Sequence, residues 1–564
     1  MDQKRVVIAI VVCAGILFAW AKFFPGAQPV PPPAAPSTTA QAPAAGSSAA
    51  PPSAAAVAGG AAPGTAAAPV APVAYPEQET VLETPEESFV FSSRGGVLKH
   101  AKLRAKKYLA HAQQPGSGID LVRTIDPGHA PLRVTFPKSA FPEPPDTAWQ
   151  LVPPAAGSPS NQVLYRAELP TVVIEKRFLA DTANYRLHLD VTVHNRTAAP
   201  QDHHLNIQVS GVQNQDSKGG FFSGASSNTT NAVCHLGTDT IREDVEKLAK
   251  EPLSKTGAVS WVAADEKFFL TAIVPYPETP PRELTCSGRA VGPDTLLGEL
   301  AFAERRVAPG ARTTYSFAVF VGPKLISDLE QVRPGGREVE LDKAVDVTLS
   351  QISRPMLWLL KFFHGFTKNW GVAIILLTIF IRLLMFYPTQ RSLMSAKKMQ
   401  KLGPKMAAIR KKYENDRQRQ SAETMNLYKA HGVSPFGGCL PSLIQMPIWI
   451  ALYSTLNYAV ELYRSPFIFH LKDLTAKDPY YVTPLLMGGV MFVQMKMSPT
   501  SPDNQQQAMM AIMMPVMFTA FSLVLPSGLA VYMLTSYLIG ILQQLWVNHL
   551  DRKANAPAPA PGRA

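Results

Sequence analysis

The sequence predicts a polytopic α-helical membrane protein with six transmembrane helices and one large exported domain of the all-β sandwich class. Three observations lead to this fold class: apolar runs that are bunched, basic residues that are concentrated in one loop, and a long stretch of period-two alternation. Of the 564 residues, 46% are hydrophobic. A bilayer core of about 30 Å needs an apolar helix of about 20 residues. Runs that approach this length cover residues 6–21, 370–387, 439–460, 480–495, 508–525 and 528–547.

Residues 1–24 are predicted to form an N-terminal transmembrane anchor. Lys4 and Arg5 precede the apolar run, and the tripeptide AWA closes it at residues 19–21. These features also describe a cleavable secretory signal peptide with an A-x-A site. We favour an uncleaved anchor, because Trp20 and the basic and aromatic residues after it are typical of a membrane interface. Both alternatives export the segment that follows.

Residues 25–74 form a low-complexity linker. Twelve Pro and twenty Ala occur among these fifty residues, and none of the fifty is charged. Such a composition cannot form a packed core, and in an extended polyproline conformation it would reach on the order of 150 Å at about 3.1 Å per residue. We therefore expect a passive tether.

The exported domain, residues 75–342, is predicted to be a β-sandwich. Apolar and polar residues alternate along 185–193 and again along 205–209. This period is typical of antiparallel strands that are buried on one face, and many such strands separated by Gly, Pro and Asn favour a sandwich. Further strands are expected at residues 89–91, 172–178, 268–274 and 315–321.

This domain offers few groups for chemistry. His203 and His204 beside Asp202 resemble metal ligands, but no further ligand has a spacing that would complete a site. Cys234 and Cys286 lie in an oxidising compartment, and the sequence leaves open whether they pair. The chain shows no phosphate-binding loop and no nucleophile beside a base. We therefore expect no enzyme activity, metal, cofactor or small-molecule substrate.

Residues 343–369 are predicted to form an interfacial helix and an elbow. A continuous helix over residues 356–387 would be about 48 Å long, well beyond the hydrocarbon core of about 30 Å. The helix must therefore bend, and Gly365 and Asn369 are the candidate positions. The first part is expected to lie on the outer membrane surface.

The distribution of basic residues predicts the orientation of the chain. The loop 388–435 carries eleven Lys or Arg and only three acidic residues. Loops this basic stay in the cytoplasm. With six crossings, both termini, including the tail 548–564, then lie in the cytoplasm, and residues 75–342 lie outside. Most of the formal net charge of +12 is therefore a topology signal.

The same loop is predicted to form a helical hairpin. Its apolar positions recur at helical spacing on two short segments; they are Leu402, Met406, Ile409, Tyr413, Met425 and Tyr428. The polar faces carry cations that could contact anionic lipid, ribosomal RNA or a nascent chain, or that could act only as topology signals. The main candidates are Lys398, Lys405, Arg410, Lys411 and Lys412.

Arg382 is the most informative single residue, because it lies in the otherwise uncharged run 370–387. A lone Arg near the bilayer centre costs at least roughly 2.5 to 3.5 kcal/mol, so such residues usually face protein or water on a functional path. Thr378 lies one turn earlier on the same helix face. The alternative is an Arg that extends along the helix to the lipid headgroups near Tyr387.

Six short motifs after residue 380 carry a resemblance to a known family. They read IR, NLYKA, PFGGC, LIQMPI, DPYY and KMSP, and they begin at residues 381, 426, 435, 443, 478 and 496; a segment ending in PSG at residue 528 adds to them. In order and spacing the chain resembles the YidC/Oxa/Alb family of membrane protein insertases, in the form with a large periplasmic domain. About 200 residues after Trp358 carry this likeness.

The resemblance implies a five-helix insertase core in the bacterial inner membrane, with a hydrophilic groove open to the cytoplasm and to lipid. The implied partners are nascent membrane proteins, the Sec translocon, the ribosome and membrane lipids, and the implied function is insertion and folding of membrane proteins, alone or with the Sec translocon. The implied groove residues are Arg382, Thr378, Gln445 and Tyr532, and Ser536 lies one turn from Tyr532.

The alternative function is a secondary transporter. Proton-coupled transporters carry acidic groups within their spans, and many are built from repeated halves. The six predicted spans contain neither Asp nor Glu, and the first spans are not repeated in the last ones. Both observations favour the insertase.

Overall fold

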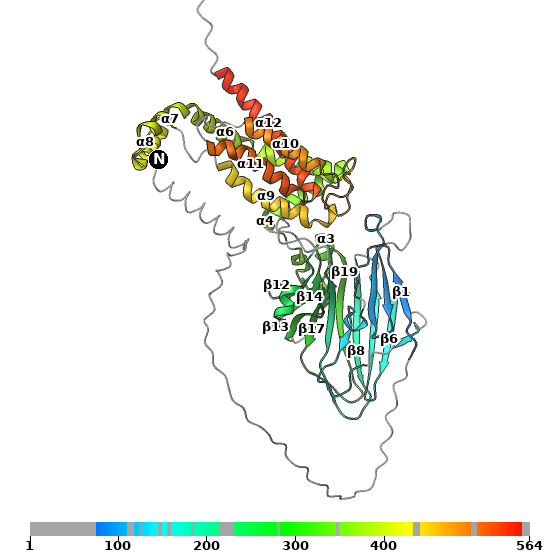
Figure 1. The fold of residues 1–564 in the computed structure, drawn as a ribbon. Coiled ribbons are helices and arrows are strands. Elements are labelled where there is room, and N and C mark those ends of the chain that lie inside the picture. Colours follow the sequence, from blue (N-terminus) through cyan, green and yellow to red (C-terminus); the bar gives the residue numbers. More distant parts are fainter. Residues whose placement is uncertain are drawn as a thin grey trace, which may run out of the picture. The chain divides into compact units, whose positions relative to one another are not determined.

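A computed structural model describes most of the chain after the predicted linker. The described residues are 75–109, 118–124, 126–144, 149–154, 159–181, 185–213, 229–278, 283–345, 347, 349–432, 440–497 and 505–554. The predicted anchor 1–24 and linker 25–74 lie outside the described residues. A β-rich part is followed by a helical part (Figure 1).

The largest sheet of the β-rich part is antiparallel and has the strand order β12-β11-β14-β15-β19-β8-β7-β6-β5. Its bounds are β5 (Gln150–Val152), β6 (Gln162–Glu168), β7 (Val172–Ala180), β8 (Arg186–Asn195), β11 (Asn231–Leu236), β12 (Asp239–Asp244), β14 (Val259–Asp265), β15 (Phe269–Pro275) and β19 (Arg312–Pro323). The alternation along 185–193 falls on β8, where Leu187, Leu189 and Val191 are buried. The strands predicted at residues 172–178, 185–193, 268–274 and 315–321 are confirmed in this sheet.

Smaller sheets complete the β-rich part, with the orders β13-β16-β17-β10-β4, β1-β2-β3 and β18-β9. Their bounds are β1 (Glu79–Glu83), β2 (Glu87–Ser92), β3 (Val97–Leu103), β4 (Val134–Thr135), β9 (Gln201–His203), β10 (Asn206–Val212), β13 (Leu253–Gly257), β16 (Leu284–Ala290), β17 (Thr295–Phe302) and β18 (Arg305–Val307). Strands β10, β16 and β17 pack on β11 and β14 of the large sheet, so the two sheets share one apolar core. This arrangement agrees with the predicted sandwich.

A disulfide between Cys234 on β11 and Cys286 on β16 joins the two packed sheets. The two Cα atoms are 6.0 Å apart, and both side chains are fully buried. The structure therefore decides a pairing that the sequence leaves open.

His203 belongs to the core of this domain. Its side chain is fully buried, and its Nε2 atom lies 2.9 Å from the Tyr315 hydroxyl. Burial, together with the neighbouring charge of Arg305, lowers the pKa of His203 to about 4. The imidazole is thus neutral near pH 7 and is engaged by Tyr315.

Short helical elements connect some of the strands; they are α2 (Val245–Lys250) and the 3₁₀ turns η1 (Lys106–Tyr108) and η2 (Pro127–His129). After the last strand, β19, come α3 (Ile326–Leu329) and the 3₁₀ turns η4 (Pro334–Gly336) and η5 (Leu341–Ala344), and η6 (Val460–Leu462) lies within the helical part.

The helical part contains the candidate site. Its helices are α4 (Ser350–Thr367), α5 (Trp370–Leu384), α6 (Phe386–Lys401), α7 (Gly403–Lys412), α8 (Arg417–Ala430), α9 (Leu440–Tyr458), α10 (Val482–Met497), α11 (Gln505–Ser522) and α12 (Ser527–Ala554). Each of the last four predicted runs falls on one helix, α9 to α12.

Among the described residues, the stretch Ser527–Leu550 of α12 is long and apolar enough to cross a membrane, and α5 with α6 adds a second span if this bent pair is one unit. Helix α10 and the stretch Ile512–Ser522 are apolar but shorter. The number of six crossings therefore stays a prediction.

The elbow before the second span lies at Asn369, one of its two predicted positions. The other position, Gly365, is wrong. Gly365 is inside α4, and the helix ends at Thr367. Lys368 has a left-handed φ of 53°, and the Asn369 side chain accepts a hydrogen bond of 3.1 Å from the Val372 amide. The chain turns at this cap because Asn is a good N-cap and satisfies a free helix amide.

The prediction that the second span is one straight helix ending at Tyr387 is wrong. Helix α5 ends at Leu384, and α6 departs from its axis by 61°. Pro388 has no amide hydrogen for the Leu384 carbonyl four residues earlier, which weakens the helix at this point. The bend directs the chain away from α5 and into the predicted hairpin.

The predicted hairpin helices are α7 and α8. Leu402 and Tyr428 are buried in one small apolar cluster, and the Tyr428 hydroxyl lies 3.1 Å from the Met406 sulfur. The assignment of Met425 to the inner face was wrong, because this side chain is 43% exposed. Leu427 packs beside Tyr428 instead and turns the inner face of α8 away from Met425.

Loss of the disulfide should destabilise the β-rich part. For a closed loop of this size we expect replacement of Cys234 and Cys286 by Ala to cost about 2 to 4 kcal/mol of unfolding free energy. Thermal unfolding of the full chain in detergent, followed by intrinsic tryptophan fluorescence, to which buried Trp261 contributes, measures this. A chain lacking only Cys13 and Cys439 is the control. An unchanged midpoint after loss of the pair would contradict the prediction.

Candidate functional site

Arg382 lies in the last turn of α5, and its side chain reaches α12. Its Nε atom donates a hydrogen bond of 2.9 Å to the Ser536 hydroxyl, and its Nη2 atom donates to the same oxygen. Ser536 is buried, and Arg382 is half-buried. In the described part of the chain no carboxylate lies within ion-pair distance of Arg382, so the hydroxyl holds the guanidinium without neutralising its charge.

Apolar side chains next to Arg382 on α5 are exposed. Leu383 and Leu384, which follow Arg382 on α5, are 67% and 66% exposed, and Ile379 is 38% exposed. Large exposed apolar side chains on a helix of an integral membrane protein are suited to lipid or to another helix. Arg382 therefore lies at the border between an apolar outer surface and the polar contact with Ser536.

A second polar contact lies one turn away on α12. The Gln445 side chain of α9 donates a hydrogen bond of 3.2 Å to the Tyr532 hydroxyl. Tyr532 is 3% exposed. Because Tyr532 and Ser536 are four residues apart, they lie on one face of α12. This face connects α9 and α5, so four of the five predicted groove residues lie in two neighbouring contacts.

Thr378 is the fifth of these residues, and its hydroxyl is used differently. The side chain is fully buried, and its hydroxyl donates a hydrogen bond of 2.7 Å to the Ile374 carbonyl of the same helix. Such a bond back to the preceding turn satisfies a hydroxyl inside an apolar environment. The structure therefore does not join Thr378 to the contacts of Arg382.

One polar residue of α12 that contacts another helix was not predicted from the sequence. Gln543 is 6% exposed, and its side chain donates a hydrogen bond of 3.2 Å to the Phe386 carbonyl at the start of α6. The next residue, Gln544, is also buried but approaches Asn548 of its own helix at 3.4 Å. Two adjacent amides in a predicted span are unusual, and this signal could have identified Gln543.

The five predicted cations of the hairpin region are exposed and lie on two helices. One is on α6 and four are on α7; they are Lys398, Lys405, Arg410, Lys411 and Lys412. Lys405 lies 3.1 Å from His431 after α8, and the Lys412 ammonium lies 5.2 Å from the Tyr413 ring. Their charges therefore face outward, where an anionic partner can reach them.

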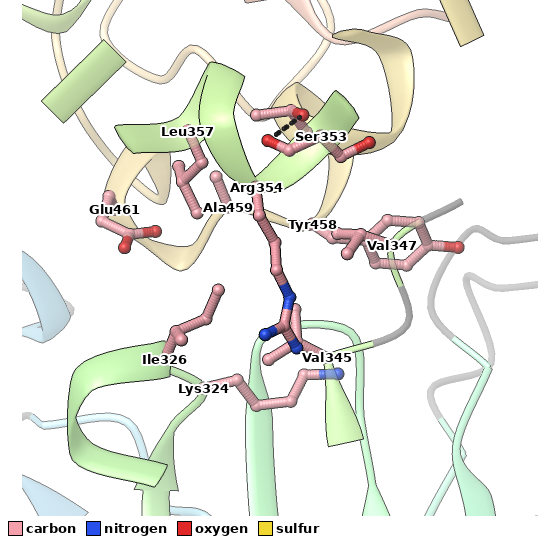
Figure 2. Close-up of a pocket in the computed structure, with 11 residues that line it drawn as sticks. Lys324, Ile326, Val345, Val347, Ser353, Arg354, Leu357, Tyr458, Ala459 and Glu461 are labelled. Atoms are coloured by element: carbon pink, nitrogen blue, oxygen red, sulfur yellow. Dashed lines mark hydrogen bonds between the residues drawn. The ribbon is translucent and has the colours of Figure 1, made fainter. Parts of the chain in front are cut away.

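A pocket near the start of α4 is too small to be the candidate site. Figure 2 shows Arg354 extending past Val345 toward Lys324, with Glu461 at another edge. The cavity has a volume of about 10 Å³, which is room for about one water molecule. Arg354 is also paired with Asp342 at 2.6 Å. No protein segment fits here.

Two family models match this chain in succession. The model described as YidC periplasmic domain matches residues 79–359, and the model described as 60Kd inner membrane protein matches residues 362–554. The first covers the β-rich part and the start of α4, and the second covers the helices that carry the polar contacts.

Full-length relatives agree with both models. The membrane protein insertase YidC of Syntrophus aciditrophicus (strain SB) is 34% identical over 563 residues, which are 97% of this chain and 99% of that protein. The membrane protein insertase YidC of Anaeromyxobacter sp. (strain K) is 36% identical, with 100% of both chains covered.

Among solved structures, the crystal structure of an active YidC insertase with its first transmembrane domain resolved covers 85% of this chain and 94% of its own. It is 20% identical with a TM-score of 0.37, which is too low to support a further conclusion. The full-length relatives are decisive, and they favour the insertase over the secondary transporter and over any enzyme. This chain therefore belongs to the YidC family of inner-membrane protein insertases that carry a periplasmic domain.

Proposed function

We propose that this insertase accepts segments of nascent membrane proteins in a polar groove lined by Arg382, Gln445, Tyr532 and Ser536. Thr378 is buried on the same helix as Arg382 and bonds to the Ile374 carbonyl of that helix. The observation that carries the proposal is the contact of Arg382 with Ser536, which holds a positive charge between α5 and α12 with no acidic partner among the described residues. Such a charge is available to an acidic residue of a substrate.

Such a groove would lower the free-energy cost of moving the polar tail of the substrate through the membrane. A charged or unpaired polar group costs several kcal/mol to bring into hydrocarbon. A hydrated groove lowers this cost, and a fixed positive charge attracts acidic side chains and holds them for a short time. Helix α10 has 16 residues and is therefore about 24 Å long. A span shorter than the hydrocarbon core thins the bilayer locally, which shortens the path further.

The hairpin formed by α7 and α8 is proposed to meet partners in the cytoplasm. Its exposed cations suit the phosphates of anionic lipid or of ribosomal RNA and the acidic segments of a nascent chain. Because α6 continues from α5, a partner at the hairpin lies on the route to the groove. Alone or beside the Sec translocon, the protein would receive substrate from this side.

The proposed topology places both termini and the hairpin in the cytoplasm, with the β-rich domain in the periplasm. The eleven basic residues of the loop 388–435 support it. Helix α4 suits the outer membrane surface, because Trp358, Phe362 and Phe366 are exposed at successive helical turns. Their rings pack along the helix and form a continuous aromatic edge.

The first prediction concerns the charge of Arg382. Arg382→Lys should keep much of the insertion activity, because it keeps the positive charge. Arg382→Ala should slow substrates with acidic tails more than substrates with neutral tails, and Arg382→Glu should be slowest, because it repels acidic tails. The measurement is the insertion rate into proteoliposomes for one substrate with tails of graded charge, at equal insertase content.

The control for this series is Arg391→Ala, which removes an exposed cation of α6 outside the groove. It should change all tails equally or not at all. A response of Arg382→Ala that is the same for every tail would remove the electrostatic role. An extended anchoring side chain would instead alter protein level or helix placement, without any dependence on substrate charge.

The second prediction concerns the division of labour between the parts. Deletion of residues 77–323 should leave insertion largely intact, because the proposed groove and hairpin are retained. Deletion of residues 396–430 should abolish insertion, because it removes the hairpin. Both chains are compared at equal amounts of membrane-integrated protein. If the first deletion, shown to be folded, abolishes insertion, the essential site lies in the β-rich domain.

The third prediction concerns topology. Single cysteines are placed at the exposed positions Ser160 and Ser421, in chains that lack the thiols of Cys13 and Cys439. An impermeant maleimide added to intact spheroplasts should label the first position strongly and the second only after lysis. Equal labelling before lysis would overturn the proposed orientation.

A further inference from the structure

One face of α12 carries polar side chains that contact three different helices. Tyr532, Ser536 and Gln543 are separated by four and seven residues, which places them within about 40° of one another around the helix. Tyr532 contacts Gln445 of α9, Ser536 contacts Arg382 of α5, and Gln543 contacts the backbone of α6. The stripe therefore extends past the groove and across the bend between α5 and α6.

The contact of Gln543 lies directly at this bend. Helix α5 ends at Leu384, and the accepting carbonyl belongs to Phe386, the first residue of α6. The helix axes differ by 61°, and Pro388 removes one of the backbone hydrogen bonds that would otherwise straighten the chain here. Backbone continuity alone therefore constrains the angle weakly, and a side-chain contact from a neighbouring helix can set it.

The burial of Gln543 makes its hydrogen bond to α6 costly to lose. Gln543 is 6% exposed, so loss of its partner would leave a buried side-chain amide without a hydrogen bond. Helix α12 also packs against both α5 and α6. The bent arrangement satisfies Gln543, whereas a straightened or rotated α6 would withdraw the Phe386 carbonyl from it.

We propose that Gln543 is a positioning residue that fixes the angle between the groove helix α5 and the hairpin helix α6, and thereby holds the hairpin where it can deliver substrate to Arg382. The inference rests on the proposed groove and hairpin route. It gives α12 a second role in the protein. At one end of its polar stripe, Ser536 binds Arg382. At the other end, Gln543 positions the start of α6, which leads to the hairpin.

The test replaces Gln543 by Met, which has a similar shape but no donor, and by Asn, which keeps an amide but is one methylene too short. Gln544→Met is the matched control, because this neighbour is equally buried but bonds within α12. Spin labels at Ser421 on α8 and His549 on α12, in a chain lacking the thiols of Cys13 and Cys439, report the position of the hairpin by pulsed electron resonance.

Both Gln543 variants should broaden or shift the distance distribution, and Gln544→Met should match the parent. A lost hydrogen bond changes the population of the bent state by about 2- to 12-fold. The insertion rate at low substrate concentration should fall by a similar factor, while the maximal rate stays within about 2-fold. A general loss of folded protein would instead lower the maximal rate in proportion.

A parent-like distance distribution for Gln543→Met or Gln543→Asn overturns the proposal, as does an equal change in Gln544→Met. If one Gln543 variant fails to accumulate, the other decides. The distance measurement does not depend on activity, so it tests the bend even if the Arg382 series fails. If the Arg382 series fails but the Gln543 variants alter the distance, the proposed groove is refuted. The role of Gln543 at the bend between α5 and α6 is then still supported.

Discussion

The helical part of this insertase depends on holding a half-buried guanidinium between two largely apolar helices. A lone buried charge would destabilise the fold, and a carboxylate partner would stabilise it but cancel the charge. The Ser536 hydroxyl accepts from Arg382 without cancelling its charge. The guanidinium therefore has a hydrogen-bond acceptor in Ser536 and remains positive. This combination requires α12 to lie against α5 in one register, and the other polar contacts follow from that register.

The packing of α12 explains why residues far apart in sequence act together. Its polar face meets Gln445 on α9, Arg382 on α5 and the start of α6, while apolar residues of the same helix pack in the shared core. One helix, α12, therefore sets the geometry between Arg382 and the start of α6, which leads to the hairpin. The bend at Met385 is necessary for this arrangement, because α6 must leave the axis of α5 to carry the hairpin away from it.

The β-rich domain is stabilised in a different way. Two antiparallel sheets share a core, and the bond between Cys234 and Cys286 connects them. An oxidising periplasm permits this bond, in agreement with the family to which the chain belongs. The domain buries His203 in a neutral form, so this member of the pair that suggested a metal contributes to packing.

Much of this architecture could be predicted from the sequence, because it depends on local patterns. The alternation along β8 reflects one buried face, and the apolar runs of α9 to α12 reflect their environment. Arg382 was identifiable because one charge interrupts such a run. Gln445 and Tyr532 were identified only through the family resemblance, and Ser536 through its spacing of one turn from Tyr532, since each is an ordinary residue in its own helix.

The sequence by itself determined the apolar helices α9 to α12, several of the strands, which loop is basic, and which residue carries an isolated charge. Only the tertiary structure decided that Cys234 pairs with Cys286, that Arg382 donates to Ser536, and that Gln543 meets the bend after α5. Met425 shows the same limit, because its spacing predicts the inner face of α8 while Leu427 occupies it. Periodicity reports which face of a segment is apolar, but the partner of each side chain depends on how distant segments pack, and that is a property of the whole fold.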